Sequence, residues 1–212
     1  MAPTPLKIGV IGSGRVGGTV GELWAKAGHE VMFSSLDLAH DKALAASIGG
    51  KAKAGTPAEA AAFGDVLLVS VPYKALPQLG RELAPLLKGK VVLASNPIAA
   101  RDGDMAVAAR EKGTGIASPE FLPGARLVRA FNEVGYQSMR SEAHRAGDKV
   151  AIPLAADDPR ALQVAIGLVK DAGFEPVVVG DLASAKKFDV GSPVFGKPLT
   201  AAQLRKALGL TP

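Results

Sequence analysis

The sequence has 212 residues, a formal net charge of +5, 48% hydrophobic residues and no cysteine. This length allows one sizeable core and is short for two large domains, so we expect a single domain over residues 1–212. The absence of cysteine excludes disulfides, thiolate metal sites and a cysteine nucleophile, and the three histidines are too widely spaced to suggest a metal site.

The basic residues are spread along the chain, and aromatic residues make up only 5% of it. This pattern argues against a nucleic-acid partner, which would favour a basic tract with interleaved aromatic side chains. The longest apolar runs have the length of strands, and the N-terminus lacks an apolar segment of signal length. We therefore expect a cytoplasmic protein with no membrane partner.

Strand-like apolar runs alternate with helical spacings along the whole chain. The expected strands are residues 6–12, 30–35, 51–55, 65–72, 90–97, 126–132, 149–155 and 175–180. The expected helices are residues 15–28, 38–50, 56–64, 74–89, 105–112, 157–173, 181–189 and 200–209. This order predicts an α/β, Rossmann-type fold: a mainly parallel sheet with helices on both faces and a short C-terminal extension. Residues 101–124 form the loosest segment, and we expect a loop or lid there.

The first strand runs into the glycine-rich turn "IGSGRVGG", which fits G-x-G-x-x-G between a strand and a helix. In this motif Gly12 permits the tight turn, Gly14 lets the backbone approach a pyrophosphate, and Gly17 allows close packing of helix on strand. The free N–H groups of the helix start favour phosphate binding. The turn therefore predicts a dinucleotide site made of Gly12, Ser13, Gly14, Arg15, Val16 and Gly17.

The second strand ends in "SSLD" instead of the acid that usually grips the ribose of NAD. Ser34 and Ser35 can donate hydroxyl hydrogen bonds to a 2′-phosphate, which favours NADP. Asp37 lies beyond the strand, and its position is compatible with either a helix cap or a ribose contact. NAD therefore remains an alternative.

Polar or proline residues follow three later strands, where ligands bind in open parallel sheets. Val71, Pro72 and Tyr73 follow one strand, and Asn96 and Pro97 follow the next. These residues are candidates for the wall of a nucleotide site, although the prolines also serve simply to end strands.

Asn132, in "AFNEVG", follows the third of these strands. Its side chain offers the donor and the acceptor that a nicotinamide carboxamide needs. The alternative role of an asparagine at this position is to form the turn.

Four segments in register resemble a known family: "KIGVIGSGRVGGTVGELWAKAGHEV", "DVLLVSVPYKAL", "LVRAFNEVG" and "GFEPVVVGDLASA". They resemble the NADP oxidoreductases that use the deazaflavin coenzyme F420, and also the cytoplasmic reductase domain of the six-transmembrane epithelial antigen of prostate ferric reductases. By matching position, the resemblance implies a nucleotide site with Ser13, Gly14, Arg15, Val16, Ser34, Ser35, Val71, Pro72, Tyr73 and Leu76. It implies that Asn96, Pro97, Phe131 and Asn132 lie near the nicotinamide.

The family resemblance implies direct hydride transfer between NADP(H) and a flavin or deazaflavin, with no acid–base residue required. We accordingly nominate no catalytic residue and no metal ligand, and we expect a small-molecule electron acceptor and a homodimer. Two departures stand out. Leu36 replaces the arginine that commonly follows the strand-end serine, and residues 189–210 differ from the family's apolar tail.

Two other functions are compatible with this sequence. The first is a non-catalytic NAD(P)(H)-binding redox sensor or partner subunit, which the missing catalytic residue favours. The second is a reductase of small imines or carbonyl compounds, but such enzymes carry an added helical domain for which the chain leaves little room. We expect the hydride-transfer enzyme.

Overall fold

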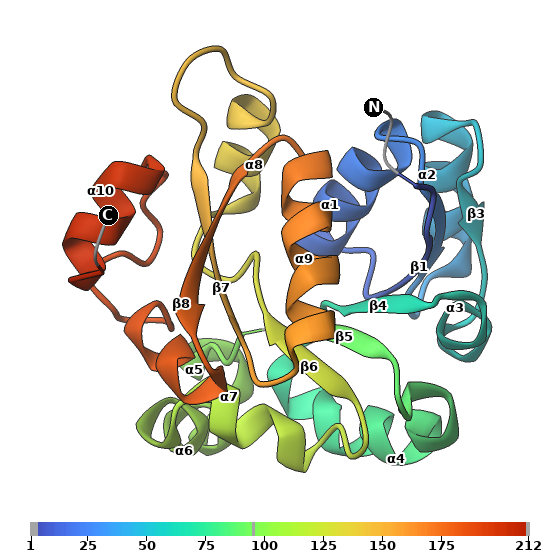
Figure 1. The fold of residues 1–212 in the computed structure, drawn as a ribbon. Helices are drawn as coiled ribbons and strands as arrows, with labels where there is room; N and C mark the ends of the chain where they lie inside the picture. The colour runs from blue at the N-terminus through green and yellow to red at the C-terminus, as the bar shows by residue number, and fades with distance from the viewer. Residues whose placement is uncertain (1–3, 95, 211–212) are drawn as a thin grey trace.

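The computed structural model describes residues 4–94 and 96–210, and within them eight strands form one sheet (Figure 1). The strands are β1 (Lys7–Ile11), β2 (Glu30–Ser34), β3 (Lys53–Ala54), β4 (Val66–Val69), β5 (Val91–Ala94), β6 (Arg126–Arg129), β7 (Ala151–Ala156) and β8 (Glu175–Gly180). Their order is β3-β2-β1-β4-β5-β6-β7-β8. Neighbouring strands are parallel except β6 and β7, which pair antiparallel. The predicted Rossmann-type α/β fold is confirmed.

Helices cover both faces of this sheet. The α-helices are α1 (Arg15–Lys26), α2 (Leu38–Ile48), α3 (Pro57–Phe63), α4 (Leu76–Leu87), α5 (Ala99–Asp102), α6 (Asp104–Lys112), α7 (Thr114–Ala117), α8 (Tyr136–Glu142), α9 (Pro159–Asp171) and α10 (Ala201–Leu208). Short 3-10 helices are η1 (Tyr73–Ala75), η2 (Ser118–Glu120) and η3 (Leu182–Lys187). One core cluster joins the sheet to α1, α2, α8 and α9, and another joins it to α3, α4, α6 and α7.

Local signals explain where several helices begin. Thr56 caps α3 in a reciprocal capping box with Glu59, and Pro57 occupies the first turn, as predicted. Asp158 caps α9 by accepting from two backbone amides. Across the packed layers, Trp24 of α1 donates from Nε1 to the Leu168 carbonyl of α9 at 2.9 Å, so a buried indole joins two helices on the same face.

Residues 101–124, expected as a loop or lid, are mostly helical. Helices α5, α6 and α7 follow one another there, and glycines with positive φ, Gly103 and Gly113, separate them. Their small buried residues pack against the sheet and against η3, whose contacts with α7 are extensive. Such short helices depend on tertiary packing more than on sequence period, which is why the periodic pattern understated them.

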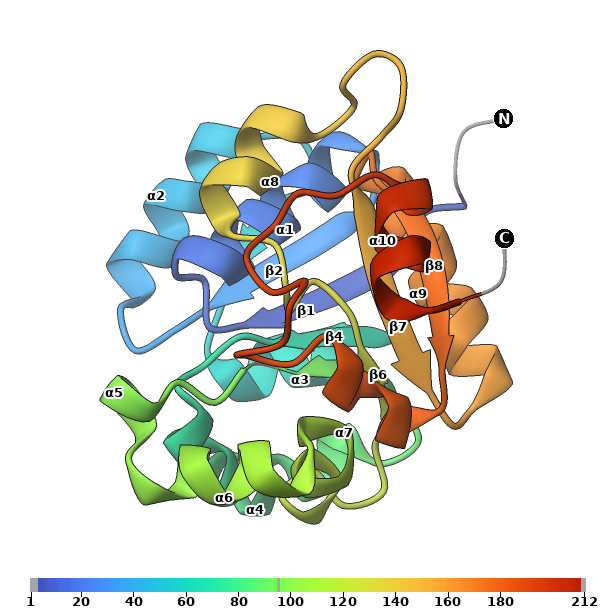
Figure 2. The same cartoon turned by 90° about the vertical axis from the view of Figure 1, so that its left-hand side faces the viewer.

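The C-terminal segment also differs from expectation. The helix expected at residues 181–189 is the 3-10 helix η3, and α8 has no counterpart among the predicted elements. Beyond η3 the chain crosses the front of the sheet to reach α10, passing between α8 and the α5–α7 layer (Figure 2). This crossing brings the tail against the carboxyl ends of the central strands.

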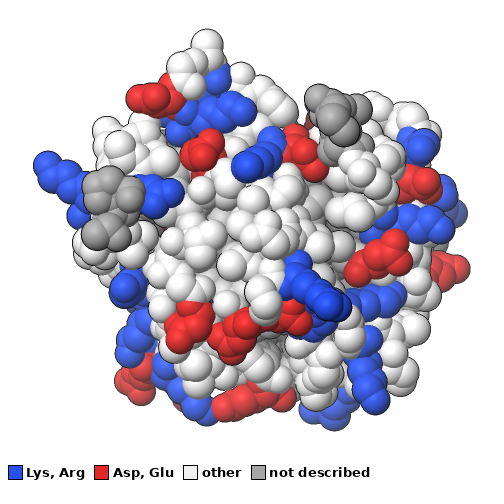
Figure 3. Space-filling view, viewed as in Figure 1, with Lys and Arg blue, Asp and Glu red and all other residues white. Residues whose placement is uncertain are grey.

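Charged side chains of both signs alternate around the face seen in Figure 3, and the middle of that face is largely uncharged. The net charge of +5 is therefore not gathered into one basic surface on this side. Among residues 4–94 and 96–210, none of the helices has the length and apolar character needed to cross a lipid bilayer.

Candidate functional site: a dinucleotide crevice

The glycine turn lies between β1 and α1 and is tied to the end of β2. Gly12 has φ +97°, and the amides of Gly12 and Ser13 both donate to the Ser34 carbonyl, at 2.8 and 3.1 Å. Gly14 is the N-cap of α1, with no side chain capping the helix and no acid in its first turn. The amides at the start of α1 are therefore left for a ligand.

Each glycine of the turn has the steric environment that the motif predicts. A Cβ on Gly17 would lie 2.0 Å from the Gly12 carbonyl oxygen, and a Cβ on Gly12 would lie 2.3 Å from the Ser70 carbonyl oxygen. By contrast, a Cβ on Gly14 would have no heavy atom within 4 Å. Gly12 and Gly17 thus serve packing, whereas Gly14 borders open space where a pyrophosphate can approach.

At the end of β2 the structure corrects the expected role of Ser34. Its side chain is fully buried, and its hydroxyl donates to the Val10 carbonyl at 2.8 Å. Ser34 therefore shapes the turn and offers no hydroxyl to a phosphate. Asp37 takes the capping role, because it is the N-cap of α2 and accepts from the His40 amide at 2.9 Å.

Ser13 and Ser35 meet at a buried carboxylate that the sequence did not single out. Asp41, in the first turns of α2, has an exposed fraction of 0%. It accepts from the Ser13 hydroxyl and, at 2.9 Å, from the Ser35 hydroxyl. One acid therefore joins the glycine turn to the end of β2.

A cavity of about 270 Å³ lies at the carboxyl ends of β4, β5 and β6. Five of the predicted site residues line it together: Val16, Val71, Asn96, Phe131 and Asn132. Arg101, Tyr136, Phe195 and Gly196 also line it, from α5, α8 and the C-terminal tail. The cavity lies where the crevice of an open parallel sheet is expected to hold the nicotinamide end of a dinucleotide.

The remaining candidates from these strand ends are not among the lining residues. Tyr73 and Leu76 are fully buried in the core cluster on the α3–α4 face, and the Tyr73 hydroxyl lies 3.1 Å from Ser118 Oγ. Burial raises the pKa of this phenol above its usual value. Pro97 is buried, and Pro72 is exposed before η1. The structure therefore gives Tyr73 and Leu76 a packing role in place of the expected nucleotide contact.

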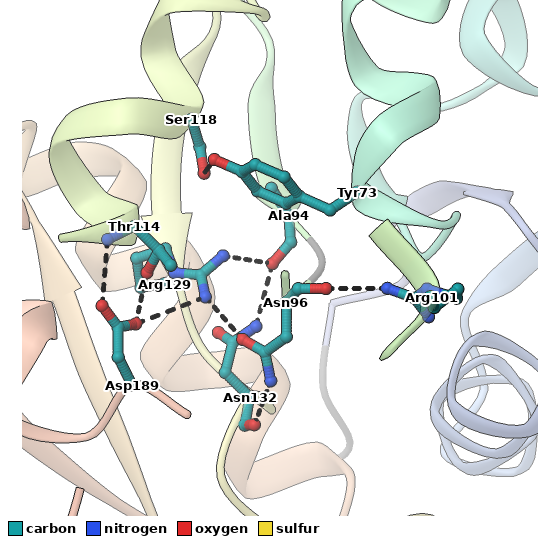
Figure 4. A network of polar contacts seen from close by, with 9 residues as sticks. All are labelled: Tyr73, Ala94, Asn96, Arg101, Thr114, Ser118, Arg129, Asn132 and Asp189. Atoms are coloured by element: carbon teal, nitrogen blue, oxygen red, sulfur yellow. Dashed lines mark hydrogen bonds and ion pairs between the residues drawn. The ribbon is translucent and has the colours of Figure 1, made fainter. Parts of the chain in front are cut away.

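A buried arginine organises the polar floor of the cavity (Figure 4). Arg129, at the end of β6, is 0% exposed and donates to the Ala94 carbonyl and to Asn96 Oδ1, each at 2.7 Å. Its Nη2 lies 3.7 Å from Asp189 Oδ1. Burial lowers the pKa of the guanidinium, and the Asp189 carboxylate opposes this shift.

The same network fixes the two asparagines. Asn96 donates from Nδ2 to the Asn132 carbonyl, and Asn132 donates from Nδ2 to the Ala94 carbonyl at 2.9 Å. These bonds determine the orientation of the Asn132 amide, because only the nitrogen can donate to a carbonyl. Asn132 Oδ1 is then a buried acceptor without a hydrogen-bond partner among the described residues, on a side chain that lines the cavity. An amide N–H of a ligand would satisfy it.

The loop that carries Asn132 is unusual in two ways. Phe131 has φ +59°, a conformation that a non-glycine residue rarely adopts and that occurs most often at functional sites. Glu133 is buried, and neither of its carboxyl oxygens has a hydrogen-bond partner of good geometry among the described residues. Burial raises the pKa of Glu133 to about 8, although the nearby backbone amides oppose the rise.

Comparison with known proteins identifies a family that the first part of the chain resembles. Residues 7–96, which carry the glycine turn and the first strand ends, match the profile of the family described as "NADP oxidoreductase coenzyme F420-dependent". The predicted resemblance to the F420-dependent NADP oxidoreductases is confirmed over these residues. The match to this family supports an NADP-dependent oxidoreductase. No match was found among the curated proteins.

Solved structures share the fold beyond the part matched by the family profile. The hypothetical protein SMa0349 from Sinorhizobium meliloti superposes with a TM-score of 0.78 at 20% identity, covering 92% of this chain and 95% of its own. A protein from Arthrobacter sp. FB24, provisionally described as an F420-dependent NADP reductase, has a TM-score of 0.74 at 22% identity, covering 97% and 96%.

An imine reductase from Myxococcus stipitatus, in complex with NAD+, has a TM-score of 0.62 at 18% identity. The match covers 86% of this chain but only 57% of the imine reductase. At these identities the superpositions show a shared fold.

Several residues of the crevice were not predicted from the sequence. Phe195 and Gly196 lie more than fifty positions beyond Asn132, and no local pattern links them to the cavity. Asp41 lies among ordinary helix residues. Arg129 did carry a signal, because a charged residue inside the apolar strand "RLVRAF" needs a buried partner.

Proposed function

We propose that this protein is an NAD(P)H-dependent oxidoreductase that transfers hydride between the nicotinamide of a bound dinucleotide and a flavin or deazaflavin acceptor. The family match supports an NADP-dependent reductase. The flavin or deazaflavin acceptor is the part that this proposal adds. The observation that carries the proposal is the unsatisfied, buried Asn132 Oδ1 at the cavity next to the glycine turn. An unpaired buried acceptor costs free energy unless a ligand completes it.

The residues of the crevice fit the two ends of a dinucleotide. The open approach at Gly14 and the uncapped start of α1 suit a pyrophosphate. The Arg15 guanidinium lies 5.6 Å from the centroid of the Tyr136 ring, so it stands between the turn and the cavity. There it supplies positive charge close to the phosphates.

At the far end, Asn132 accepts from the carboxamide and fixes the rotation of the nicotinamide ring about its bond to the ribose. Arg129 and Asn96 hold this asparagine in place through the Ala94 carbonyl and the Asn132 backbone. The apolar side chains of Val16, Val71 and Phe131 exclude water from the ring. Such positioning is the main contribution of a protein to hydride transfer.

When bound, the nicotinamide supplies a hydride, which carries two electrons to the acceptor. Among the described residues, those that line the cavity include no carboxylate and no histidine. Their contribution is therefore orientation and exclusion of water. The acceptor is proposed to stack on the exposed face of the ring, beside the tail residues Phe195 and Gly196.

The test mixes the purified protein with NADPH or NADH and, separately, with a deazaflavin, FMN, FAD or a ferric chelate, and follows loss of the reduced-nicotinamide absorbance. Turnover with a deazaflavin or flavin is the expected result. Tight nucleotide binding with no turnover of any acceptor would contradict the proposal and favour the non-catalytic sensor or partner subunit.

A further inference from the structure

Three serine hydroxyls surround the adenosine end of the crevice, and all three direct their protons into the protein. Ser34 donates to the Val10 carbonyl at 2.8 Å. Ser13 donates to Asp41, and Ser35 donates to the other oxygen of Asp41 at 2.9 Å. The direction of each bond is fixed by chemistry, because a carbonyl or carboxylate oxygen can only accept.

A hydroxyl whose single proton is already given can only accept from a ligand. The 2′-phosphate of NADP(H) consists of acceptor oxygens, so it finds no donor in these hydroxyls. The 2′-hydroxyl of NAD(H) carries a proton and can donate to Ser35, which is half-buried at the strand end. The Asp37 carbonyl, 3.2 Å from Ser35 Oγ, is a second acceptor for the same proton, so the proton points into the protein in either case. Ser35 also accepts from the Asp37 amide at 3.1 Å, which leaves one of its two lone pairs for a ligand.

The charges at this end agree with the hydrogen bonds. Two carboxylates, Asp37 and Asp41, lie beside the strand end, and the fully exposed side chain between Ser35 and Asp37 is Leu36. Arg15 is drawn toward Tyr136 on the nicotinamide side. Lys42 and His40 of α2 are exposed and offset part of the negative charge. Asp41 lies closer to the serine hydroxyls than these basic side chains do, because it accepts hydrogen bonds from both Ser13 and Ser35. Its negative charge therefore opposes a 2′-phosphate at this position.

We propose that Asp41 sets the nucleotide selectivity of this protein, so that the adenosine end accepts NAD(H) at least as readily as NADP(H). Asp41 acts as a positioning residue, because it is fully buried and reaches a ligand only through the half-buried Ser35. Ser13, which is 2% exposed, holds the other oxygen of Asp41. The inference rests on the proposed dinucleotide site and concerns only its adenosine end.

The experiment measures binding by calorimetry for NADH and NADPH, and for the fragments ADP and 2′,5′-ADP, which probe the adenosine end without any turnover. We expect the wild-type protein to bind the members of each pair within about tenfold of each other. In Asp41→Asn the amide donates to one serine and frees its proton, so the affinity for 2′,5′-ADP should rise about tenfold while that for ADP stays constant. Asp158→Asn, which removes an acid at the distant start of α9, should leave the ratio unchanged.

Ser35→Ala covers the case in which Asp41→Asn does not fold. It removes the acceptor for the 2′-hydroxyl and should weaken ADP about fivefold while sparing 2′,5′-ADP. A wild-type preference for 2′,5′-ADP above about 100-fold, or equal changes for both fragments in the variants, would overturn the inference and leave the proposed function intact. Failure of both dinucleotides to bind would overturn both.

Discussion

The two ends of the crevice use buried charge in opposite ways. At the proposed adenosine end a buried acid, Asp41, accepts hydrogen bonds from the Ser13 and Ser35 hydroxyls. The oxygen of Ser35 is then available to a ligand only as an acceptor. At the proposed nicotinamide end a buried cation, Arg129, donates to the Ala94 carbonyl and to Asn96 Oδ1, and the buried Asn132 Oδ1 has no hydrogen-bond partner among the described residues.

Both ends therefore present acceptors to the ligand, but for different reasons. The first is set by one acid that joins two adjacent βα units, and the second by a network that reaches from β6 to the tail through Asp189. A buried polar network loses folding free energy when one of its members is left unpaired. A substitution at the second end should therefore affect more residues than one at the first end. Substitutions at four positions test this difference between the two ends.

The largest expected effect is on the pH dependence of folding stability, through Glu133, which follows Asn132 in the chain. Its folded-state pKa of about 8 lies above the ordinary 4.5, so the folded protein favours the neutral carboxyl. Folding stability should then fall as pH rises from about 4.5 to about 8, by on the order of 4 kcal/mol. Urea unfolding across this range measures the slope, and Glu133→Gln should remove this part of it. An identical slope in the variant would mean that Glu133 is charged in the fold.

Gly14→Val tests the pyrophosphate position shared by both ends. The added side chain meets no protein atom near its Cβ, so thermal stability should change little, whereas dinucleotide affinity should fall about 100-fold. Gly167→Ala in α9, also free of nearby atoms, is the matched control and should leave binding unchanged. Normal affinity in Gly14→Val would place the pyrophosphate elsewhere.

Asn132→Leu removes the open acceptor of the nicotinamide end at similar volume. We expect kcat/KM to fall about 30-fold, with ADP binding unaffected, because one hydrogen bond to the carboxamide is lost and the adenosine end is untouched. Ile98→Val, elsewhere on the cavity wall, serves as the control and should change kcat/KM by less than about threefold. Loss of ADP binding in Asn132→Leu would show that the two ends are not independent.

Leu36→Arg should give the smallest effect. It adds a guanidinium at the fully exposed position beside Ser35. NADPH affinity should rise about fivefold and NADH affinity should stay constant, as expected for a solvent-exposed charge pair. The gain should shrink at high salt. A gain that salt does not reduce would argue for a direct packing effect of the longer side chain.

Local sequence patterns were sufficient to predict the fold class and to nominate a nucleotide site. The glycine turn, the apolar parallel strands and the caps of α3 and α9 are specified by neighbouring residues, so their physics is visible within a few positions. The expectation that ligands bind at the carboxyl ends of parallel strands also predicted Val71, Asn96 and Asn132, which line one cavity, because parallel strands end on the same edge of the sheet.

Only the tertiary structure decided what those side chains offer to a ligand. Ser13 and Asp41 are 28 residues apart, and Thr114 and Asp189 are 75 apart, so neither pairing leaves a local trace in the sequence. The sequence shows that Ser34 and Ser35 carry hydroxyls but not where their protons point. That direction depends on which acceptor the folded chain brings within hydrogen-bond distance, and here both protons point to acceptors inside the protein, the Val10 carbonyl and Asp41.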